Sequence, residues 1–226
     1  MHYWLVMPAA GIGRRFGAER PKQYAPLRGR TVIEWALAPF LRDARCAGAM
    51  VALAADDPYW REIAPAGVLS APGGAERSHS VRNALAALAP RAQAQDWVLV
   101  HDAARPCLPD ADLERLVAEL AGHPVGGLLA TPAADTLKRA DAAGCVAETV
   151  DRTGLWRALT PQMFRYGLLC AALDQAHAAG RTPTDEAQAV EWLGERPALV
   201  AASAANLKIT RAADLTLAAA LLEALA

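Results

Sequence analysis

The sequence predicts an α/β fold in which helices cover both faces of a mostly parallel β-sheet. Short apolar runs of strand length alternate with amphipathic helical patterns along most of the 226 residues, and this alternation is typical of parallel sheets. Hydrophobic residues make up 54% of the chain and charged residues 21%, a composition that supports a well-buried core. We therefore expect a single domain that spans residues 1–226.

Local periodicity predicts the individual elements. Apolar runs predict strands at residues 3–7, 50–53, 97–100, 126–131, 198–202 and 207–209. Amphipathic spacing predicts helices at residues 31–41, 80–88, 112–120, 168–179 and 184–193, and a last helix from Arg211. The first of these helices has a capping box, because Glu34 follows Thr31 by three residues.

The alternation of strands and helices breaks between residues 135 and 160. Residues 136–139 and 145–150 predict two strands joined across the turn at 141–144, a hairpin with little core of its own. Such a β-arm is either a surface flap or a dimerisation arm that borrows a core from a second chain. The sequence leaves both interpretations open.

The overall charge argues against a nucleic-acid partner. Lys and Arg total 23, whereas Asp and Glu total 24, which gives a net charge of −1. Nucleic-acid-binding domains usually carry a basic surface. Any phosphate group must therefore be bound by local clusters of Arg and Lys.

The cysteine pattern and the hydropathy predict a cytoplasmic protein. The four cysteines form no C-x-x-C pair and no metal-ligand spacing, so we expect free thiols in a reducing compartment. The apolar stretch at residues 3–7 is too short for a signal-peptide core and has no basic leader. No run of about 18 apolar residues lacks a charge or a helix breaker, so we expect no membrane span.

A glycine-rich loop at residues 8–17, PAAGIGRRFG, follows the first predicted strand directly. Exposed backbone N–H groups in such a loop can bind phosphates. The spacing G-x-G-x-x-x-G departs from the dinucleotide fingerprint, and no G-K-[ST] follows as in a Walker A loop. Arg15 and Lys22 could flank a triphosphate, although an ordinary glycine-rich turn remains the alternative.

A second glycine turn, PGGAERSHS, occupies residues 72–80. It offers backbone groups ahead of a helix, and Ser80 offers a hydroxyl near the start of that helix. A simple turn with a helix cap explains the same residues. His79 is a lone histidine, for which we expect a surface role and not a ligand role.

The motif HDAARP, residues 101–106, follows a strongly apolar predicted strand. Open α/β sheets bind ligands at the carboxyl ends of their strands. Asp102 could bind Mg²⁺ or hydroxyl groups there, and Arg105 is suited to an anion. A surface salt bridge is the alternative.

Near the C-terminus, Lys208 lies between two apolar neighbours, Leu207 and Ile209. It is either an exposed lysine at a sheet edge or a lysine that points into a cleft. The sequence does not choose between these two positions.

Taken in order along the chain, the motifs resemble those of the 2-C-methyl-D-erythritol 4-phosphate cytidylyltransferase family of the non-mevalonate isoprenoid pathway: PAAGIGRR, PKQY, GGAERSHSV, HDAARP, DTLKR, TVDRTGLWRALTPQ, TDEA and NLKIT. The resemblance runs from about Leu5 to Leu222. It implies a Rossmann-like domain whose β-arm, at about residues 135–160, exchanges with a partner to form a homodimer. It also implies transfer of CMP from CTP to methylerythritol phosphate with the help of Mg²⁺. We expect the phosphates to hold most of the coordination sites of this ion, with Asp102 as a candidate protein ligand.

The resemblance also implies roles for individual residues. The catalytic residues are Arg15, Lys22 and Lys208. The nucleotide-binding residues are Pro8, Ala9, Ala10, Gly11, Gly13, Gly73, Gly74, Ala75, Ser80 and Asp102. The substrate-binding residues are Asp102, Ala103, Arg105, Asp135, Thr136, Arg152, Thr160 and Thr184, of which Arg152 and Thr160 resemble residues that reach in from the partner subunit.

One position departs from the family pattern. Residue 75 is Ala, whereas the family often carries Asp in this glycine turn. We expect this change to weaken one nucleotide contact modestly, because the backbone groups of the turn are unaffected.

Three alternative functions stay open at the level of the sequence. A sister cytidylyltransferase that acts on ribitol 5-phosphate shares the glycine loop and the general plan. A nicotinamide dehydrogenase is disfavoured by the glycine spacing and by the lack of an acid about twenty residues further on. A non-catalytic nucleotide-binding module need not keep Lys22, Arg105 and Lys208, and all three are present.

Overall fold

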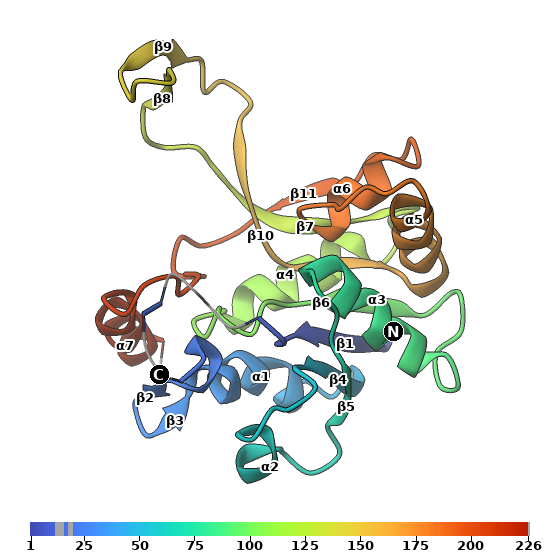
Figure 1. Ribbon diagram of the computed structural model, residues 1–226. Helices are drawn as coiled ribbons and strands as arrows, with labels where there is room; N and C mark the ends of the chain where they lie inside the picture. The colour runs from blue at the N-terminus through green and yellow to red at the C-terminus, as the bar shows by residue number, and fades with distance from the viewer. Residues whose placement is uncertain (12–15, 18–19, 226) are drawn as a thin grey trace.

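The computed structural model describes residues 1–11, 16–17 and 20–225, and a seven-stranded sheet forms its centre (Figure 1). The strand order is β11-β7-β10-β6-β1-β4-β5. Neighbouring strands pair in parallel, except that β10 runs antiparallel to both β6 and β7. The strands are β1 Tyr3–Pro8, β4 Cys46–Leu53, β5 Leu69–Pro72, β6 Trp97–Val100, β7 Gly126–Pro132, β10 Trp156–Arg165 and β11 Ala198–Ala201.

Helices cover both faces of this sheet, as predicted. The helices α1 (Val32–Arg42) and α4 (Asp110–Leu120) pack on one face in a core shared with Leu5 of β1 and Leu99 of β6. The opposite face is covered by α3 (Arg77–Leu88), α5 (Tyr166–Ala178) and α6 (Glu186–Glu191). Alternate strand residues therefore feed two cores, which is why the strands read as continuous apolar runs.

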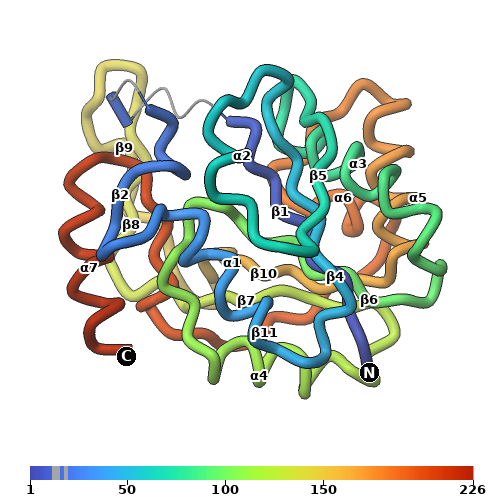
Figure 2. The backbone as a smooth tube through the Cα atoms, turned by 90° about the horizontal axis from the view of Figure 1, so that it is seen from below, coloured from blue at the N-terminus to red at the C-terminus, as the bar shows by residue number. Residues whose placement is uncertain are grey.

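Smaller elements complete the described chain. The short α2 (Trp60–Ile63), the 3-10 helix η1 (Lys22–Tyr24) and the hairpin β2–β3 (Pro26–Leu27 and Arg30–Thr31) connect the main elements. The last helix, α7 (Asp214–Ala224), packs through Ala218 and Leu222 in a third core with Val32 of α1. Figure 2 shows α7 at one end of the molecule and α5 at the other.

The predicted capping box of the first helix is confirmed. The backbone N–H of Thr31 donates to the carboxylate of Glu34 over 2.7 Å. This bond satisfies one of the backbone donors that a helix start leaves without a partner.

Several expectations about elements are wrong in detail. Residues 207–209 were expected to form a strand but are an irregular segment, in which the N–H of Ile209 donates to the carbonyl of Ala104. Helix α3 begins at Arg77 and not at Ser80, so that Ser80 lies within the first turn. Helix α6 begins after Asp185, whose carboxylate caps the N–H of Gln188. The central strand β10 and the edge strand β5 were not expected at all.

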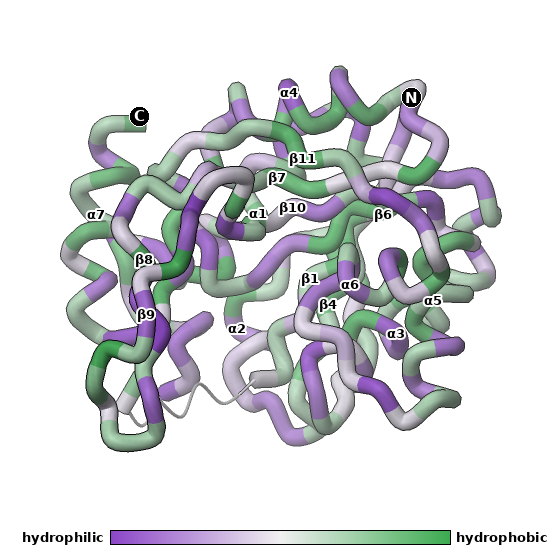
Figure 3. The backbone as a smooth tube through the Cα atoms, turned by 90° about the horizontal axis from the view of Figure 1, so that it is seen from above, coloured by the Kyte–Doolittle hydropathy of each residue, from purple (hydrophilic) through white to green (hydrophobic). Residues whose placement is uncertain are grey.

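The predicted β-arm is present as a hairpin of β8 (Leu137–Ala140) and β9 (Val146–Val150), which pair antiparallel. It projects away from the sheet in Figure 1, and Figure 3 shows hydrophilic and hydrophobic residues alternating along it. Leu137 and Val146 are both exposed on this arm. The hairpin therefore has little apolar cover from its own chain.

Among the residues that the structure describes, no helix has both the length and the apolar character needed to cross a lipid bilayer.

Candidate functional site

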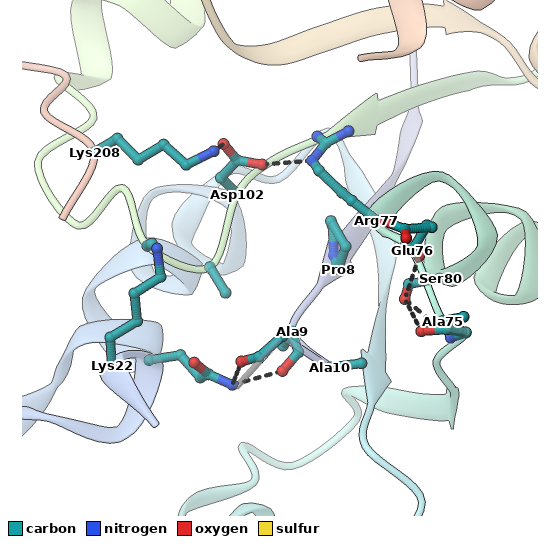
Figure 4. Close-up of a pocket in the computed structure, with 15 residues that line it drawn as sticks. Pro8, Ala9, Ala10, Lys22, Ala75, Glu76, Arg77, Ser80, Asp102 and Lys208 are labelled. Atoms are coloured by element: carbon teal, nitrogen blue, oxygen red, sulfur yellow. Dashed lines mark hydrogen bonds and ion pairs between the residues drawn. The ribbon is translucent and has the colours of Figure 1, made fainter. Parts of the chain in front are cut away.

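A cavity of about 300 Å³ opens at the carboxyl ends of β1 and β6 (Figure 4). This is the edge at which open α/β sheets bind ligands, because the strand-to-helix loops gather there. Its walls come from five separate segments of the chain: Pro8, Ala9, Ala10 and Gly11; Lys22 and Gln23; Gly74, Ala75, Glu76, Arg77 and Ser80; Asp102, Ala103 and Ala104; and Lys208.

The cavity thus joins residues from both glycine-rich segments and from the PKQY, HDAARP and NLKIT motifs. The choice that the sequence left open for Lys208 is resolved, because its side chain points into the cavity (Figure 4) and is 40% exposed. Two other predicted residues, Gly13 and Arg15, lie outside the described residues.

The two glycine-rich segments touch each other. A Cβ atom added at Gly73 would lie 2.3 Å from the Cβ of Ala10, and one added at Gly74 would lie 2.4 Å from the Cβ of His79. Non-bonded carbon atoms do not approach this closely. Glycine is required at position 73 because the two loops pack together there, and at position 74 because the turn packs against its own His79.

We expect Gly73→Ala to open this contact. Inserting a methyl group into packed structure costs about 1–3 kcal/mol, so the unfolding temperature should fall and the KM for the nucleotide should rise. The matched control is Gly122→Ala, because a Cβ added at Gly122 would have no neighbour within 4 Å. Thermal unfolding and steady-state kinetics check the pair, and an unchanged KM in Gly73→Ala would contradict the role given to this contact.

Ser80 fixes the second glycine turn from inside helix α3. Its Oγ accepts from the N–H of Gly74 over 3.0 Å and donates to the carbonyl of Glu76 over 3.2 Å. The cap at the helix start that the sequence offered as an alternative is wrong for Ser80, because α3 begins three residues earlier. The hydroxyl instead holds the turn against the helix.

Gln23 fixes the first glycine loop through hydrogen bonds to its backbone. The sequence did not predict this role for Gln23. Its Nε2 donates to the carbonyls of Ala9, over 2.7 Å, and of Gly11, over 3.1 Å. The neighbouring Lys22 donates from Nζ to the carbonyl of Ile209 over 2.9 Å. The PKQY motif therefore anchors the loop and places Lys22 at the cavity.

A cluster of five charged side chains lies at the cavity and directly behind it. Asp102 forms ion pairs with Arg77 (2.9 Å), Lys208 (2.8 Å) and Arg105 (3.5 Å). Arg77 also pairs with the buried Glu186, from Nη1 over 2.6 Å and from Nη2 over 3.1 Å. Three cations face two carboxylates, so the cluster carries a net charge of +1.

This cluster keeps Asp102 ionised. Burial alone would raise the pKa of the Asp102 carboxyl, but Arg77, Lys208 and Arg105 hold that pKa well below its usual range. Burial raises the pKa of Glu186, against the opposing effect of Arg77. Burial would lower the pKa of the Arg77 guanidinium, but the two carboxylates raise it, so Arg77 stays charged.

Asp102 does not fit the role of a metal ligand that the sequence suggested as possible. Its Oδ1 accepts from Arg77, and its Oδ2 lies beside Lys208 and Arg105. A divalent cation at this carboxylate would lie among three positive charges. In addition, the described part of the chain contains no group of three or more His, Cys, Asp or Glu side chains that could hold a metal ion.

His101 links the turn that carries Asp102 and Arg105 to strand β10. The carbonyl of Arg105 lies 3.1 Å from Nε2 of this fully buried ring, and Oγ1 of Thr160 lies 3.0 Å from Nδ1. Because a carbonyl only accepts, Nε2 carries the proton and Thr160 donates to Nδ1. Thr160 in turn accepts from the N–H of Asp102 over 3.1 Å.

We expect His101 to make the folded state sensitive to acid. Burial lowers the pKa of His101 to about 4, whereas an unfolded histidine has a pKa of about 6.5. Protonation therefore favours the unfolded chain: the stability is fully present above pH 6.5 and is lost as the pH falls toward 4. At pH 5 the loss should be about 2 kcal/mol.

Denaturant unfolding between pH 7.5 and pH 5 checks this expectation. The His101→Gln variant should lose about that much less stability over this range than the wild-type chain does. The exposed His2→Gln variant should behave like the wild type. Equal pH dependence in the wild type and in His101→Gln would rule out this role.

Other predicted substrate residues lie away from the cavity lining. Arg105 and Thr160 are buried behind it, with the guanidinium of Arg105 donating to the carbonyl of Asn206. The others are exposed, on the segments that flank the β-arm or just before α6: Asp135, Thr136, Arg152 and Thr184. Their contacts with a substrate stay predictions.

The sequence reasoning gave no role to Arg77 or to Glu186. Both stand inside motifs that it quoted, GGAERSHS and TDEA. The only signal available was the presence of a charged residue in a segment expected to approach the sheet edge. The ion pair itself joins residues 109 positions apart.

Comparisons with known proteins agree over nearly the whole chain. The family model for 2-C-methyl-D-erythritol 4-phosphate cytidylyltransferase matches residues 3–224. The enzyme of that name from Ectopseudomonas mendocina is 58% identical over 217 residues, which cover 94% of this chain and 92% of that protein. The corresponding enzyme from Halorhodospira halophila is 57% identical over 229 residues, with coverages of 98% and 94%.

A solved structure shows the same fold. The crystal structure of a 4-diphosphocytidyl-2C-methyl-D-erythritol synthase superposes with a TM-score of 0.87 at 41% sequence identity. The superposition covers 98% of this chain and 100% of the other.

Proposed function

The chain belongs to the 2-C-methyl-D-erythritol 4-phosphate cytidylyltransferase family, and we propose that its cavity transfers CMP from CTP to 2-C-methyl-D-erythritol 4-phosphate. The products are 4-diphosphocytidyl-2-C-methyl-D-erythritol and pyrophosphate. The protein is a nucleotidyltransferase of isoprenoid biosynthesis. The observation that carries the residue assignments is that a single cavity brings together the glycine loop, the glycine turn, Asp102, Lys22 and Lys208.

The nucleophile needs little activation by the protein. A phosphate monoester has a second pKa near 6 and is largely dianionic at neutral pH, so no strong general base is required. The barrier is electrostatic, because two unit charges about 4 Å apart repel by about 4 kcal/mol at an effective dielectric of 20. Catalysis therefore depends on positioning and on fixed positive charge, as in other phosphoryl-type transfers.

The cavity supplies that positive charge. Lys22 adds a fourth cation to Arg77, Arg105 and Lys208, and Glu76 on the cavity wall adds a third carboxylate to Asp102 and Glu186, so the net charge is +1. We assign Lys22, and Arg15 of the glycine loop, to the triphosphate. Backbone N–H groups of residues 9–11 would bind further phosphate oxygens, and attack in line on the α-phosphorus would expel pyrophosphate.

We assign Lys208 an ion-pair partner that changes when the substrate binds, from Asp102 to the α-phosphate. In the structure its Nζ pairs with Oδ2 of Asp102, and an α-phosphate entering the cavity offers a competing anion. When Lys208 turns to the phosphate, Arg77 and Arg105 still neutralise Asp102. The exchange therefore leaves no buried carboxylate without a cation.

The remaining assignments follow from the family and from the exposed arm. Mg²⁺ would enter with the triphosphate and take its ligands from phosphate oxygens and water, because Asp102 is occupied by cations. Each chain would form a single domain. The arm, on which Leu137 and Val146 are exposed, would pack against a second copy of the chain to form a homodimer. The free cysteines of the described chain suit the reducing cytoplasm.

Pyrophosphate release in the presence of CTP and Mg²⁺ tests this function. Methylerythritol 4-phosphate and ribitol 5-phosphate should be offered in parallel, and we expect release with the first acceptor alone. Release with ribitol 5-phosphate alone would keep the chemistry and change the acceptor. Release with neither would contradict the proposed activity.

A further inference from the structure

Arg77 is the residue through which three segments of the active site meet. It lies at the start of α3, and its guanidinium reaches Asp102 after β6 and Glu186 at the start of α6. We propose that Arg77, held in place by Glu186, is a positioning residue that fixes Asp102 for the acceptor substrate. This inference rests on the proposed function, since it names how one side of that site is organised.

The geometry leaves Arg77 little freedom. Its Nη1 and Nη2 both donate to Glu186, and its Nε donates to Oδ1 of Asp102 over 2.9 Å. A two-pronged bond to one carboxylate fixes the plane of the guanidinium, and that plane then fixes the direction of Nε. Lysine has no such fork and could not make the same three bonds from one position.

Because Glu186 is buried, it holds the guanidinium of Arg77 in a fixed position. Its side chain is 1% exposed and the Asp102 side chain is 8% exposed. A buried carboxylate needs a cation and filled hydrogen-bonding positions, and Arg77 supplies these to Glu186 from the cavity wall. The pair therefore stays formed while other partners of Asp102 change.

The two oxygens of Asp102 have different partners. Oδ1 accepts from Arg77, whereas Oδ2 pairs with Lys208, and Figure 4 shows these two cations on opposite sides of the carboxylate. When Lys208 moves to a phosphate, Oδ2 keeps only the longer ion pair with Arg105 (3.5 Å) and becomes available to accept a hydrogen bond from a hydroxyl of a polyol phosphate. Arg77 keeps Oδ1 and hence the orientation of that acceptor oxygen.

The test compares variants of two arginines on the same helix. Arg77→Gln is combined with Glu186→Gln, so that no carboxylate is left buried without its cation. The matched control is Arg82→Gln, because Arg82 also lies in α3, is 28% exposed against 27% for Arg77, and pairs with Asp174 outside the cavity. A third variant, Arg77→Lys, keeps the charge and removes the fork.

We expect the double variant to stay folded and to raise the KM for methylerythritol phosphate by at least about tenfold, equivalent to about 1.4 kcal/mol. The KM for CTP should change less than about twofold, and Arg77→Lys should not restore the acceptor KM. Arg82→Gln should match the wild type in both constants.

An unchanged acceptor KM in the double variant, or an equal rise in both KM values, would overturn the proposal. Full recovery by Arg77→Lys would also overturn it, because a point charge would then suffice. Failure of the proposed function gives a different result, namely a wild-type enzyme that releases no pyrophosphate with methylerythritol phosphate.

Discussion

Lys208→Ala should lower kcat by at least about a hundredfold, the scale seen when one oriented charge-stabilising donor is removed. The reason is that Lys208 enters the cavity beside Asp102 and is the cation there that can move to the reacting phosphate. Its side chain is partly exposed, so the variant should unfold within a few degrees of the wild type. Arg15→Ala carries the same expectation on sequence grounds.

Two control variants distinguish the position of the Lys208 side chain from the mere presence of a positive charge in this segment. Arg211→Ala removes an exposed cation from the same loop, three residues further on, and should leave kcat unchanged. Lys208→Arg keeps the charge and should recover part of the rate. Wild-type turnover in Lys208→Ala, measured by pyrophosphate release at saturating substrates, would remove Lys208 from the catalytic residues.

Asp102→Asn should reduce kcat/KM for the acceptor by at least about 30-fold. Removing one charge from a buried, hydrogen-bonded pair costs about 2–5 kcal/mol, and 2 kcal/mol corresponds to about 30-fold. Arg77, Arg105 and Lys208 would then face only one carboxylate, that of Glu186. The added positive charge should leave the KM for CTP unchanged or lower.

The control is Asp174→Asn, which removes a carboxylate paired with Arg82 away from the cavity. It should leave both KM values at the wild-type level. Steady-state kinetics with each substrate varied in turn checks the pair. If Asp102→Asn weakened CTP binding as much as acceptor use, the assignment of Asp102 to the acceptor side would be wrong.

Much of the fold was visible in the sequence because its strands are buried on both faces. Runs such as residues 97–100 are apolar throughout, and the structure buries every residue of that strand. The central strand β10 was missed because its sequence, WRALTPQMFR, mixes polar and apolar residues around Pro161. Its outer half joins the exposed arm, and its inner half carries Thr160 and Gln162 behind the site.

The strand predicted at residues 207–209 is absent, and the reason is that a pattern of buried and exposed side chains does not by itself require strand pairing. Ile209 is fully buried in the core beside α7, and the alternation around Lys208 reflects that burial. The segment makes one backbone hydrogen bond to the turn after β6, from Ile209 to Ala104, and no ladder. Apolar alternation reports which side chains are covered, and strand pairing is a separate condition.

The candidate site was predictable where its residues follow local rules. Glycine loops after a strand and charged residues at the end of a strand are visible over a few positions, and these gave Lys22, Asp102 and the two glycine turns. The pair of Arg77 and Glu186 depends on how α3 and α6 pack on the same face of the sheet. Long-range contacts of this kind have no local signature.

CMP transfer is tested most directly by identifying the bonds that the reaction makes and breaks. With CTP, Mg²⁺ and methylerythritol 4-phosphate, phosphorus NMR should show a new diphosphate diester and free pyrophosphate in equal amounts. That result is the transfer of CMP to the acceptor phosphate. Pyrophosphate accompanied by free CMP, or formed at the same rate without the acceptor, would mean hydrolysis of CTP and would contradict a transferase activity.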